Sequence, residues 1–182
     1  MGFGMMLYLM YVFVISVWNA FAGGVRMSSR KTWDKVVGVT AVVAGMLGMT
    51  YGFSLLLGVF PLFAAYLIIA PLVGLGLIIV VDSWYIYKET KSIWVLVIAI
   101  YNTVVTFWNI ILMIKLLKDV KWEDIVKIGG GGAVAFGLSN VMGLLVSAIV
   151  SLIIGIIIAW MGHKLFSDGE AELRKVPSGF KA

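Results

Sequence analysis

The chain contains no cysteine, and the other residue types that carry most enzyme and metal chemistry are nearly as scarce. Without cysteine there are no disulfides, thiolate nucleophiles or iron–sulfur ligands. Haem, copper and zinc sites need several donors from histidine, cysteine or carboxylates, whereas the chain has a single histidine, His163. We expect His163 to be a solvated residue just beyond a membrane span. The sequence therefore predicts a protein that is not an enzyme and that holds no cofactor and no metal.

Charge is also scarce: 13% of residues are charged, about half the share of an ordinary soluble domain, and 62% are hydrophobic. Four stretches carry no charge at all, namely 1–25, 36–81, 92–114 and 128–162. A helix needs roughly 20 apolar residues to cross the hydrocarbon core, so the second stretch holds two spans, separated near Pro61. The sequence predicts an all-α, polytopic integral membrane bundle of five spans. Their bounds are about 3–25, 36–57, 61–81, 92–114 and 139–161.

The last uncharged stretch has 35 residues and would form a helix about 50 Å long, which exceeds one ordinary span. We place the span at 139–161 and treat 128–138 as a separate entry into the membrane, with one long helix as the alternative. Four consecutive poor helix formers indicate a hinge in this entry, namely Gly129, Gly130, Gly131 and Gly132. A second hinge is predicted at Pro71, because a proline in the middle of the third span removes one backbone hydrogen bond and kinks the helix.

Lysine and arginine are distributed unevenly over the segments between the spans. With five spans, segments 26–35, 82–91 and 162–182 share one side and hold ten of the 14 basic residues. Basic residues mark the cytoplasmic side, so the sequence predicts a cell-membrane protein with its N-terminus outside and its C-terminus in the cytoplasm. This bias explains the net charge of +5, and no nucleic-acid partner is expected. The predicted bundle, 1–166, is followed by a short polar tail, 167–182.

Small residues recur at every fourth position in two of the predicted spans, which places them on one helical face. In the last span the ridge contains Gly143, Ser147, Ser151, Gly155 and Ala159, and in the second span it contains Ala44, Gly48 and Gly52. Such faces let helices approach closely in a bilayer, where association depends on packing and hydrogen bonds. Besides the lipid bilayer, the expected partners are a second copy of the chain, giving a homo-oligomer, or other membrane subunits.

Asn102, Thr106 and Asn109 lie at i, i+4 and i+7 and therefore share one face of the fourth span. Amides in hydrocarbon need hydrogen-bond partners. The sequence leaves two interpretations open. Together with Ser147 and Ser151 the stripe lines a solute path, or it bonds to these serines and holds two helices together.

No Asp, Glu, Lys or Arg lies in the middle of a predicted span, which disfavours coupling of transport to protons or ions. Asp82, at the end of the third span, is expected at the membrane interface near Lys88. The sequence thus favours a passive pore or facilitator for a small uncharged solute. The alternative is a non-catalytic accessory or assembly subunit of a larger membrane complex. The absence of glutamine and the low number of asparagines also favour a thermophilic source.

Overall fold

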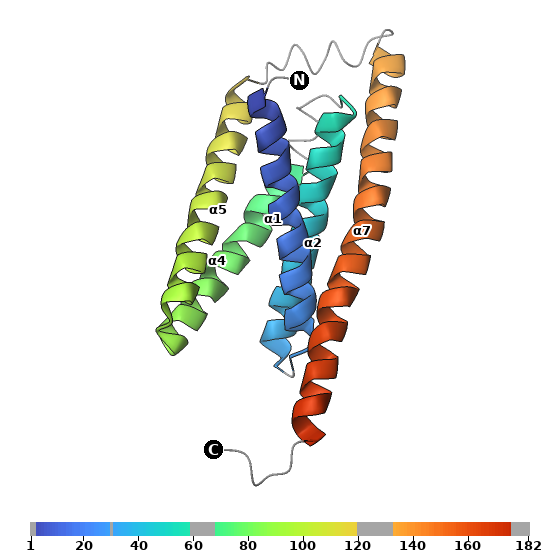
Figure 1. Cartoon of the computed structure of the whole chain (residues 1–182). Helices are drawn as coiled ribbons and strands as arrows, with labels where there is room; N and C mark the ends of the chain where they lie inside the picture. Colours follow the sequence, from blue (N-terminus) through green and yellow to red (C-terminus); the bar gives the residue numbers. More distant parts are fainter. Residues whose placement is uncertain (1–2, 30, 59–67, 120–132, 176–182) are drawn as a thin grey trace.

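The computed structural model describes residues 3–29, 31–58, 68–119 and 133–175. These parts of the chain form five helices: α1 (Phe3–Met27), α2 (Thr32–Leu56), α4 (Ala70–Thr90), α5 (Ile93–Asp119) and α7 (Ala133–Lys175) (Figure 1). All five are long and apolar enough to cross a membrane, so the predicted five-helix membrane bundle is confirmed. The start of α1 and the end of α7 lie at opposite ends of the bundle (Figure 1).

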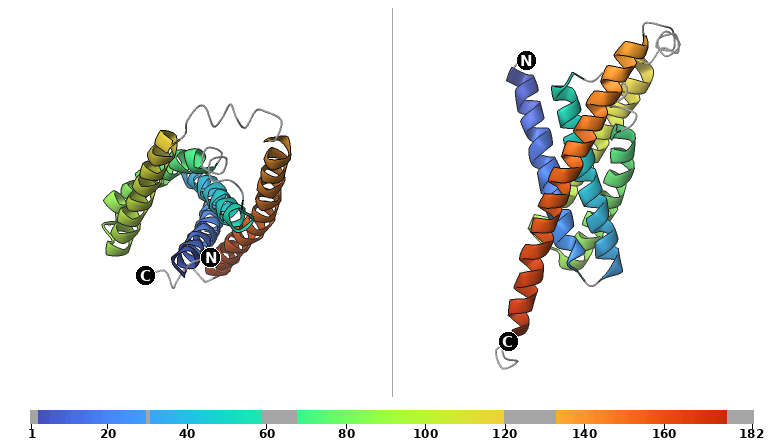
Figure 2. Two further views of the ribbon diagram at one scale, coloured as in Figure 1. Left: turned by 90° about the horizontal axis from the view of Figure 1, so that it is seen from above. Right: turned by 90° about the vertical axis from the view of Figure 1, so that its right-hand side faces the viewer.

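Helices α1, α2 and α7 pack against one another and form a three-helix unit (Figure 2). Glycines allow its closest approaches. A Cβ atom added at Gly23 would lie 2.5 Å from the carbonyl oxygen of Gly38, and one added at Gly24 would lie 2.8 Å from the Cα of Ala159. Because a methyl group fits at neither position without moving the facing backbone, Gly23 limits the α1–α2 distance and Gly24 limits the α1–α7 distance.

Helices α4 and α5 form an antiparallel hairpin on the side of the bundle away from α7 (Figures 1 and 2). The turn between them starts at Lys91, which adopts the left-handed conformation with φ of 52°. Two side-chain hydrogen bonds connect the helices. The Asn102 amide donates to the Ser83 hydroxyl at 2.8 Å, and the Trp84 indole donates to the Thr103 hydroxyl at 3.0 Å. The hairpin is therefore a second structural unit with polar contacts of its own.

The hairpin joins the three-helix unit through α2, at the beginning of α4. Ile69 and Val73 are buried there, and Tyr51 of α2 packs against them together with Ile110 and Met113 of α5. This first attachment is apolar. Polar attachments also occur: the hydroxyl oxygens of Tyr11 in α1 and Tyr101 in α5 lie 3.5 Å apart. A second polar attachment lies farther along α4 and belongs to the candidate site.

The structure corrects the predicted position of Pro71. Helix α4 begins at Ala70, so Pro71 lies in its first turn and not in the middle of a span. Proline is common at the first positions of an α-helix, and residues 68–69, directly before α4, are π-helical. The earlier start predicted for this span, at residue 61, lies outside the described residues.

Helix α7 is one continuous element of 43 residues, about 65 Å long. Residues 133–138 form its first turns, so the prediction that they are separate from the last span is wrong and the long-helix alternative holds for them. The predicted hinge glycines, 129–132, lie outside the described residues. At its other end α7 runs to Lys175 and extends past the other helices (Figure 1).

Candidate functional site

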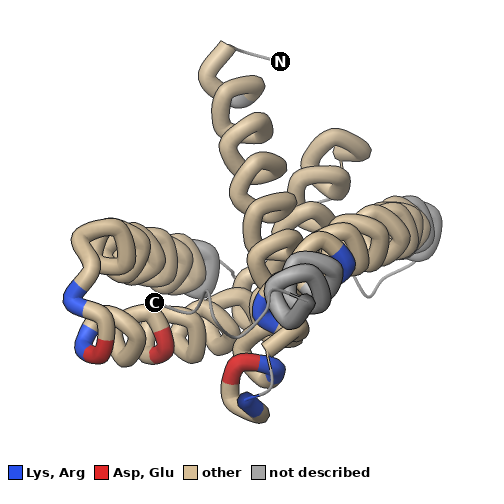
Figure 3. The backbone as a smooth tube through the Cα atoms, turned by 60° about the horizontal axis from the view of Figure 1, so that its bottom comes forward, with Lys and Arg blue, Asp and Glu red and all other residues tan. Residues whose placement is uncertain are grey.

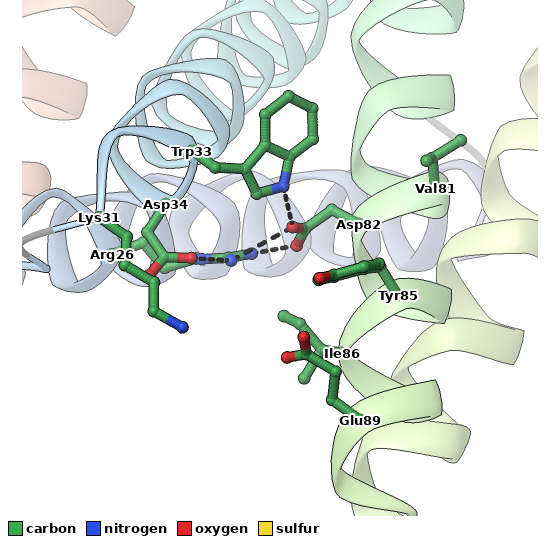
Figure 4. A pocket seen from close by; sticks show the side chains of 9 residues that line it. All are labelled: Arg26, Lys31, Trp33, Asp34, Val81, Asp82, Tyr85, Ile86 and Glu89. Atoms are coloured by element: carbon green, nitrogen blue, oxygen red, sulfur yellow. Dashed lines mark hydrogen bonds and ion pairs between the residues drawn. The ribbon is translucent and has the colours of Figure 1, made fainter.

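An aspartate is buried where α4 meets the turn between α1 and α2 (Figure 4). Asp82 is 2% exposed, and its carboxylate accepts hydrogen bonds from two side chains of the three-helix unit. The Arg26 guanidinium donates to both carboxylate oxygens, with 3.3 Å between Nη2 and Oδ1. The Trp33 indole Nε1 donates to the same Oδ1 at 2.9 Å. These contacts form the second polar attachment of the hairpin to the three-helix unit.

Arg26 has a second carboxylate partner, which does not belong to α4. Its Nη2 lies 2.7 Å from Oδ1 of Asp34, and the Ser29 hydroxyl donates to the other Asp34 oxygen at 2.7 Å. Arg26 lies in the last turn of α1 and Asp34 in the first turn of α2, so the short turn between these helices brings the two side chains together. We call Arg26, Trp33, Asp34 and Asp82 the charge cluster. One guanidinium compensates two carboxylates in it, and loss of that guanidinium would leave Asp82 buried and unpaired.

The predicted neighbour of Asp82 differs from the structure, in which its partners are Arg26 and Trp33 and not Lys88. The sequence placed it at the membrane interface near Lys88 because the third span was ended at residue 81. Helix α4 instead continues to Thr90, so Asp82 lies two turns before the helix end and faces the protein, while Lys88 is exposed. Sequence reasoning used Arg26 only as part of the positive-inside bias and missed its partners. The available signal was an acidic and a basic residue at span ends on the same predicted side, where ionisable groups commonly pair.

The charge cluster borders an open space, which we call the vestibule. One part of about 410 Å³ lies between the α1–α2 turn and α4, where Tyr85 and Glu89 line it (Figure 4). An adjoining part of about 480 Å³ is also lined by Arg26 and Asp34. Figure 3 shows charged residues gathered at this end of the bundle, on the α1–α2 turn, the end of α4 and α7. The vestibule is therefore an open space with charged side chains in its lining, beside a nearly buried carboxylate.

A separate cavity of about 160 Å³ lies between the three-helix unit and the hairpin, with lining residues from α1, α2, α4 and α5. Its polar and aromatic lining consists of Tyr8, Tyr11, Ser16, Asn19, Tyr51, Trp108 and Asn109. No charged residue is among the described residues that line it. We call it the neutral cavity.

Two amides face the neutral cavity without a protein hydrogen bond to any described residue, Asn19 from α1 and Asn109 from α5. Both side chains are half-buried. The hydroxyl of Ser16 differs from them because it donates to the carbonyl oxygen of Val12 in its own helix at 2.6 Å. An amide carries both donors and an acceptor. The two helices therefore present matching hydrogen-bonding groups to whatever occupies the space between them.

The three residues of the predicted stripe have different environments, although they share one face of α5. Asn109 lines the neutral cavity, whereas Asn102 donates to Ser83 of α4. Thr106 is buried against α4, where a Cβ atom added at Gly76 would lie 2.7 Å from its hydroxyl oxygen. The stripe thus contributes both to an interhelical contact and to a cavity wall.

Ser147 and Ser151 lie on the buried face of α7, away from this stripe. Each hydroxyl donates to a carbonyl oxygen of its own helix, Ser147 to Gly143 at 2.8 Å and Ser151 to Ser147 at 2.7 Å. The expectation that these serines bond to the α5 stripe is wrong, and neither serine lines the neutral cavity. The reason is the packing order, since α5 packs on α4 whereas α7 packs on α1 and α2.

The small-residue ridge of α7 faces both other helices of the three-helix unit. A Cβ atom added at Gly155 would lie 2.5 Å from Cγ of Met46 in α2, and Ala159 lies against Gly24 in α1. Gly143 is half-buried. The ridge therefore lies at two interfaces at once.

The small residues of α2 face α1. Gly48 lies against Ser16, and Gly52 lies against the ring of Phe13. Ala44 is buried and lines the neutral cavity. The close α1–α2 contact thus forms one border of the candidate site.

In the described parts of the chain, no group of three or more His, Cys, Asp or Glu side chains is arranged to hold a metal ion. No protein family matches the chain, and comparisons with curated proteins and with solved structures give no match. Five apolar helices fit a multi-pass integral membrane protein.

Proposed function

We propose that this protein is a non-enzymatic facilitator that lets a small uncharged polar solute cross the cell membrane through the neutral cavity. The observation that carries the proposal is the pair of amides, Asn19 and Asn109, that face this cavity without protein partners in the described residues. A polar group in hydrocarbon is costly unless it is hydrogen-bonded. A passing solute or water supplies the missing bonds.

The chemistry of the lining selects the class of solute. Amides, tyrosine hydroxyls and the Trp108 indole offer donors and acceptors, and the described lining carries no charge to compensate an ion. An ion entering such a space loses hydration without gaining a counter-charge, so it is excluded. A volume of about 160 Å³ suits a solute of a few heavy atoms, such as a small amide or polyol.

The proposed orientation places the N-terminus outside and the C-terminus in the cytoplasm, following the distribution of basic residues. The charge cluster and the vestibule then lie on the cytoplasmic side, because Arg26 lies in the last turn of α1, at its cytoplasmic end in this orientation, and bonds to Asp82.

The test is solute flux into proteoliposomes made from the purified chain alone. Shrinkage and re-swelling after an osmotic step, followed by light scattering, measure entry of a graded series of neutral amides and polyols. We expect re-swelling faster than in empty liposomes for the smallest neutral solutes and none for sodium or chloride. Absence of protein-dependent flux for every solute in the series would refute the proposal.

A second candidate, a non-catalytic accessory subunit of a larger membrane complex, is favoured by α5. In the most apolar stretch of α5, only 11% of the residues are buried within the chain. The helix packs chiefly against α4. In this case the partner would be another membrane subunit or a second copy of the chain. Mild detergent extraction followed by native mass determination distinguishes the two, since a facilitator of this kind acts without a different subunit bound.

A further inference from the structure

One face of α1 runs from the neutral cavity to the charge cluster. Tyr8, Val12, Ile15 and Asn19 line the cavity at spacings of three and four residues, and Arg26 follows Asn19 after seven residues. Positions seven apart lie on the same side of a helix, about 10 Å apart along its axis. Arg26 therefore lies about 10 Å beyond the Asn19 end of the cavity, on the same side of α1, and lines the vestibule.

The contact that Arg26 makes at this point connects the two structural units. Arg26 and Trp33 come from the three-helix unit, whereas Asp82 comes from the α4–α5 hairpin (Figure 4). Asp82 lines the vestibule and yet is 2% exposed, because the guanidinium and the indole cover it. The same side chains thus hold the units together and form part of the vestibule wall.

We propose that the contact of Asp82 with Arg26 and Trp33 is a gate that closes the neutral cavity towards the vestibule. The gate opens when α4 moves away from the α1–α2 turn. This inference rests on the proposed function for its purpose, although its geometry can be tested without any solute.

The charge cluster makes such an opening feasible. Separating a buried ion pair is costly mainly because it leaves buried charges without partners. Here the guanidinium keeps Asp34 at 2.7 Å, and Asp34 belongs to the same unit as Arg26 and moves with it. Asp82 would turn towards the vestibule, a space of about 410 Å³ in which water can solvate its carboxylate. Both charges therefore retain partners in the open state, and two states of similar free energy become possible.

The absence of cysteine provides a direct test, because a single introduced thiol reports on access to the cavity. The reporter is Asn19→Cys, at the cavity end nearest the gate. A membrane-impermeant thiol reagent is added to sealed vesicles in which the charged end of the bundle faces the reagent, and the labelling rate is measured. With the gate intact we expect slow labelling.

Two matched substitutions then distinguish the effect of the contact between the units from the effect of the other charges in the cluster. Asp82→Asn weakens the contact between the units, whereas Asp34→Asn removes the other carboxylate of Arg26 and leaves that contact in place. We expect Asp82→Asn to raise the labelling rate about tenfold, which corresponds to roughly 1.4 kcal/mol, and Asp34→Asn to change it less than twofold. Equal rates in a folded Asp82→Asn protein, or equal increases in both variants, would overturn the gate.

If Asp82→Asn does not fold, Trp33→Phe decides the question, because it removes only the indole donor to Asp82. We expect the labelling rate to rise, because the Asp82 carboxylate loses one charge-assisted hydrogen bond, but by less than tenfold, because the guanidinium still covers it. No increase would again overturn the gate. The labelling rate does not depend on solute flux. If Asp82→Asn raises the labelling rate but the protein carries no solute, the proposed function is refuted and the gate is supported. If the protein carries solute but the labelling rate does not respond to Asp82→Asn, the gate is refuted and the proposed function is supported.

Discussion

Replacing Gly24 by alanine tests the helix packing at its tightest point. The added methyl carbon would lie 2.7 Å from the carbonyl carbon and 2.8 Å from the Cα of Ala159, whereas ordinary contact begins at 3.4 Å. These two atoms and the carbonyl oxygen of Ala159, which lies nearest of the three, belong to the α7 backbone and cannot rotate away. Helices α1 and α7 must therefore move apart by about half an ångström or more, which weakens the contacts along their shared interface.

Two other glycines supply matched comparisons. At Gly155 the methyl carbon meets Cγ of Met46 at 2.5 Å, but a methionine side chain has three rotatable bonds and can yield. At Gly74, within α4, nothing lies within 4 Å. Glycine-to-alanine replacement inside a helix gains about 1 kcal/mol from helix propensity. We therefore expect Gly74→Ala to stabilise and Gly155→Ala to be close to neutral.

For Gly24→Ala, overpacking at a rigid site costs about 1–3 kcal/mol, enough to exceed the propensity gain over most of that range. A free-energy change of 1 kcal/mol shifts the Tm of a chain of this size by about 2–4 °C. Thermal unfolding of the three purified variants in one detergent, followed by tryptophan fluorescence, should rank Gly24→Ala lowest. If Gly24→Ala unfolds at or above the Tm of Gly74→Ala, then α1 and α7 do not approach as closely as the structure shows.

Asn102→Leu should destabilise the bundle by about 0.6 kcal/mol, and by no more than about 2 kcal/mol, because it removes one interhelical hydrogen bond to Ser83. A double-mutant cycle with Ser83→Ala, measured by reversible denaturation, gives the coupling energy of the pair, and a coupling energy of zero argues against the bond. Arg26→Met should lower the free energy of unfolding by about 3–5 kcal/mol, because it leaves the buried Asp82 carboxylate unpaired. The double variant Arg26→Met, Asp82→Leu should recover most of that loss, and a double variant less stable than Arg26→Met would show that burial of an unpaired charge is not the cause. A protease-sensitive tag after residue 182 should be cleaved only in inverted vesicles, and cleavage in intact cells means that the orientation is reversed.

Much of the fold follows from residue types that are common to any lipid-embedded helix. The uncharged stretches gave the number of helices, because charge is expensive in hydrocarbon whatever surrounds it. Helix ends were harder to place. The first span was predicted to end at 25 and the third at 81, although Arg26 and Asp82 continue the helices. A charged residue ends an apolar stretch in the sequence but does not end a helix, provided that it has a partner in the folded protein.

The candidate site was less predictable because it depends on which helices become neighbours. Asn109 was identified as a cavity or contact residue from its spacing alone, since amides rarely face lipid. Asn19 shares its environment and was passed over, although Ser16, three residues earlier on the same helix, also lines the cavity. The serines of α7 were assigned to the same site because one helical face can be read from sequence, while the helix that it faces cannot. Packing of α5 on α4 and of α7 on α1 and α2 decided that question.

The central claim, that a neutral solute passes between the three-helix unit and the hairpin, is tested most directly by comparing flux through Asn109→Leu and Ser147→Ala. Asn109 faces the neutral cavity without a protein partner in the described residues, and Ser147 is buried on α7 away from that cavity. In proteoliposomes with equal amounts of protein, we predict that Asn109→Leu lowers flux of the permeant solute about tenfold while its Tm stays within a few degrees of wild type. Ser147→Ala should retain wild-type flux. Unchanged flux in Asn109→Leu, or an equal loss in Ser147→Ala at unchanged stability, would contradict the account.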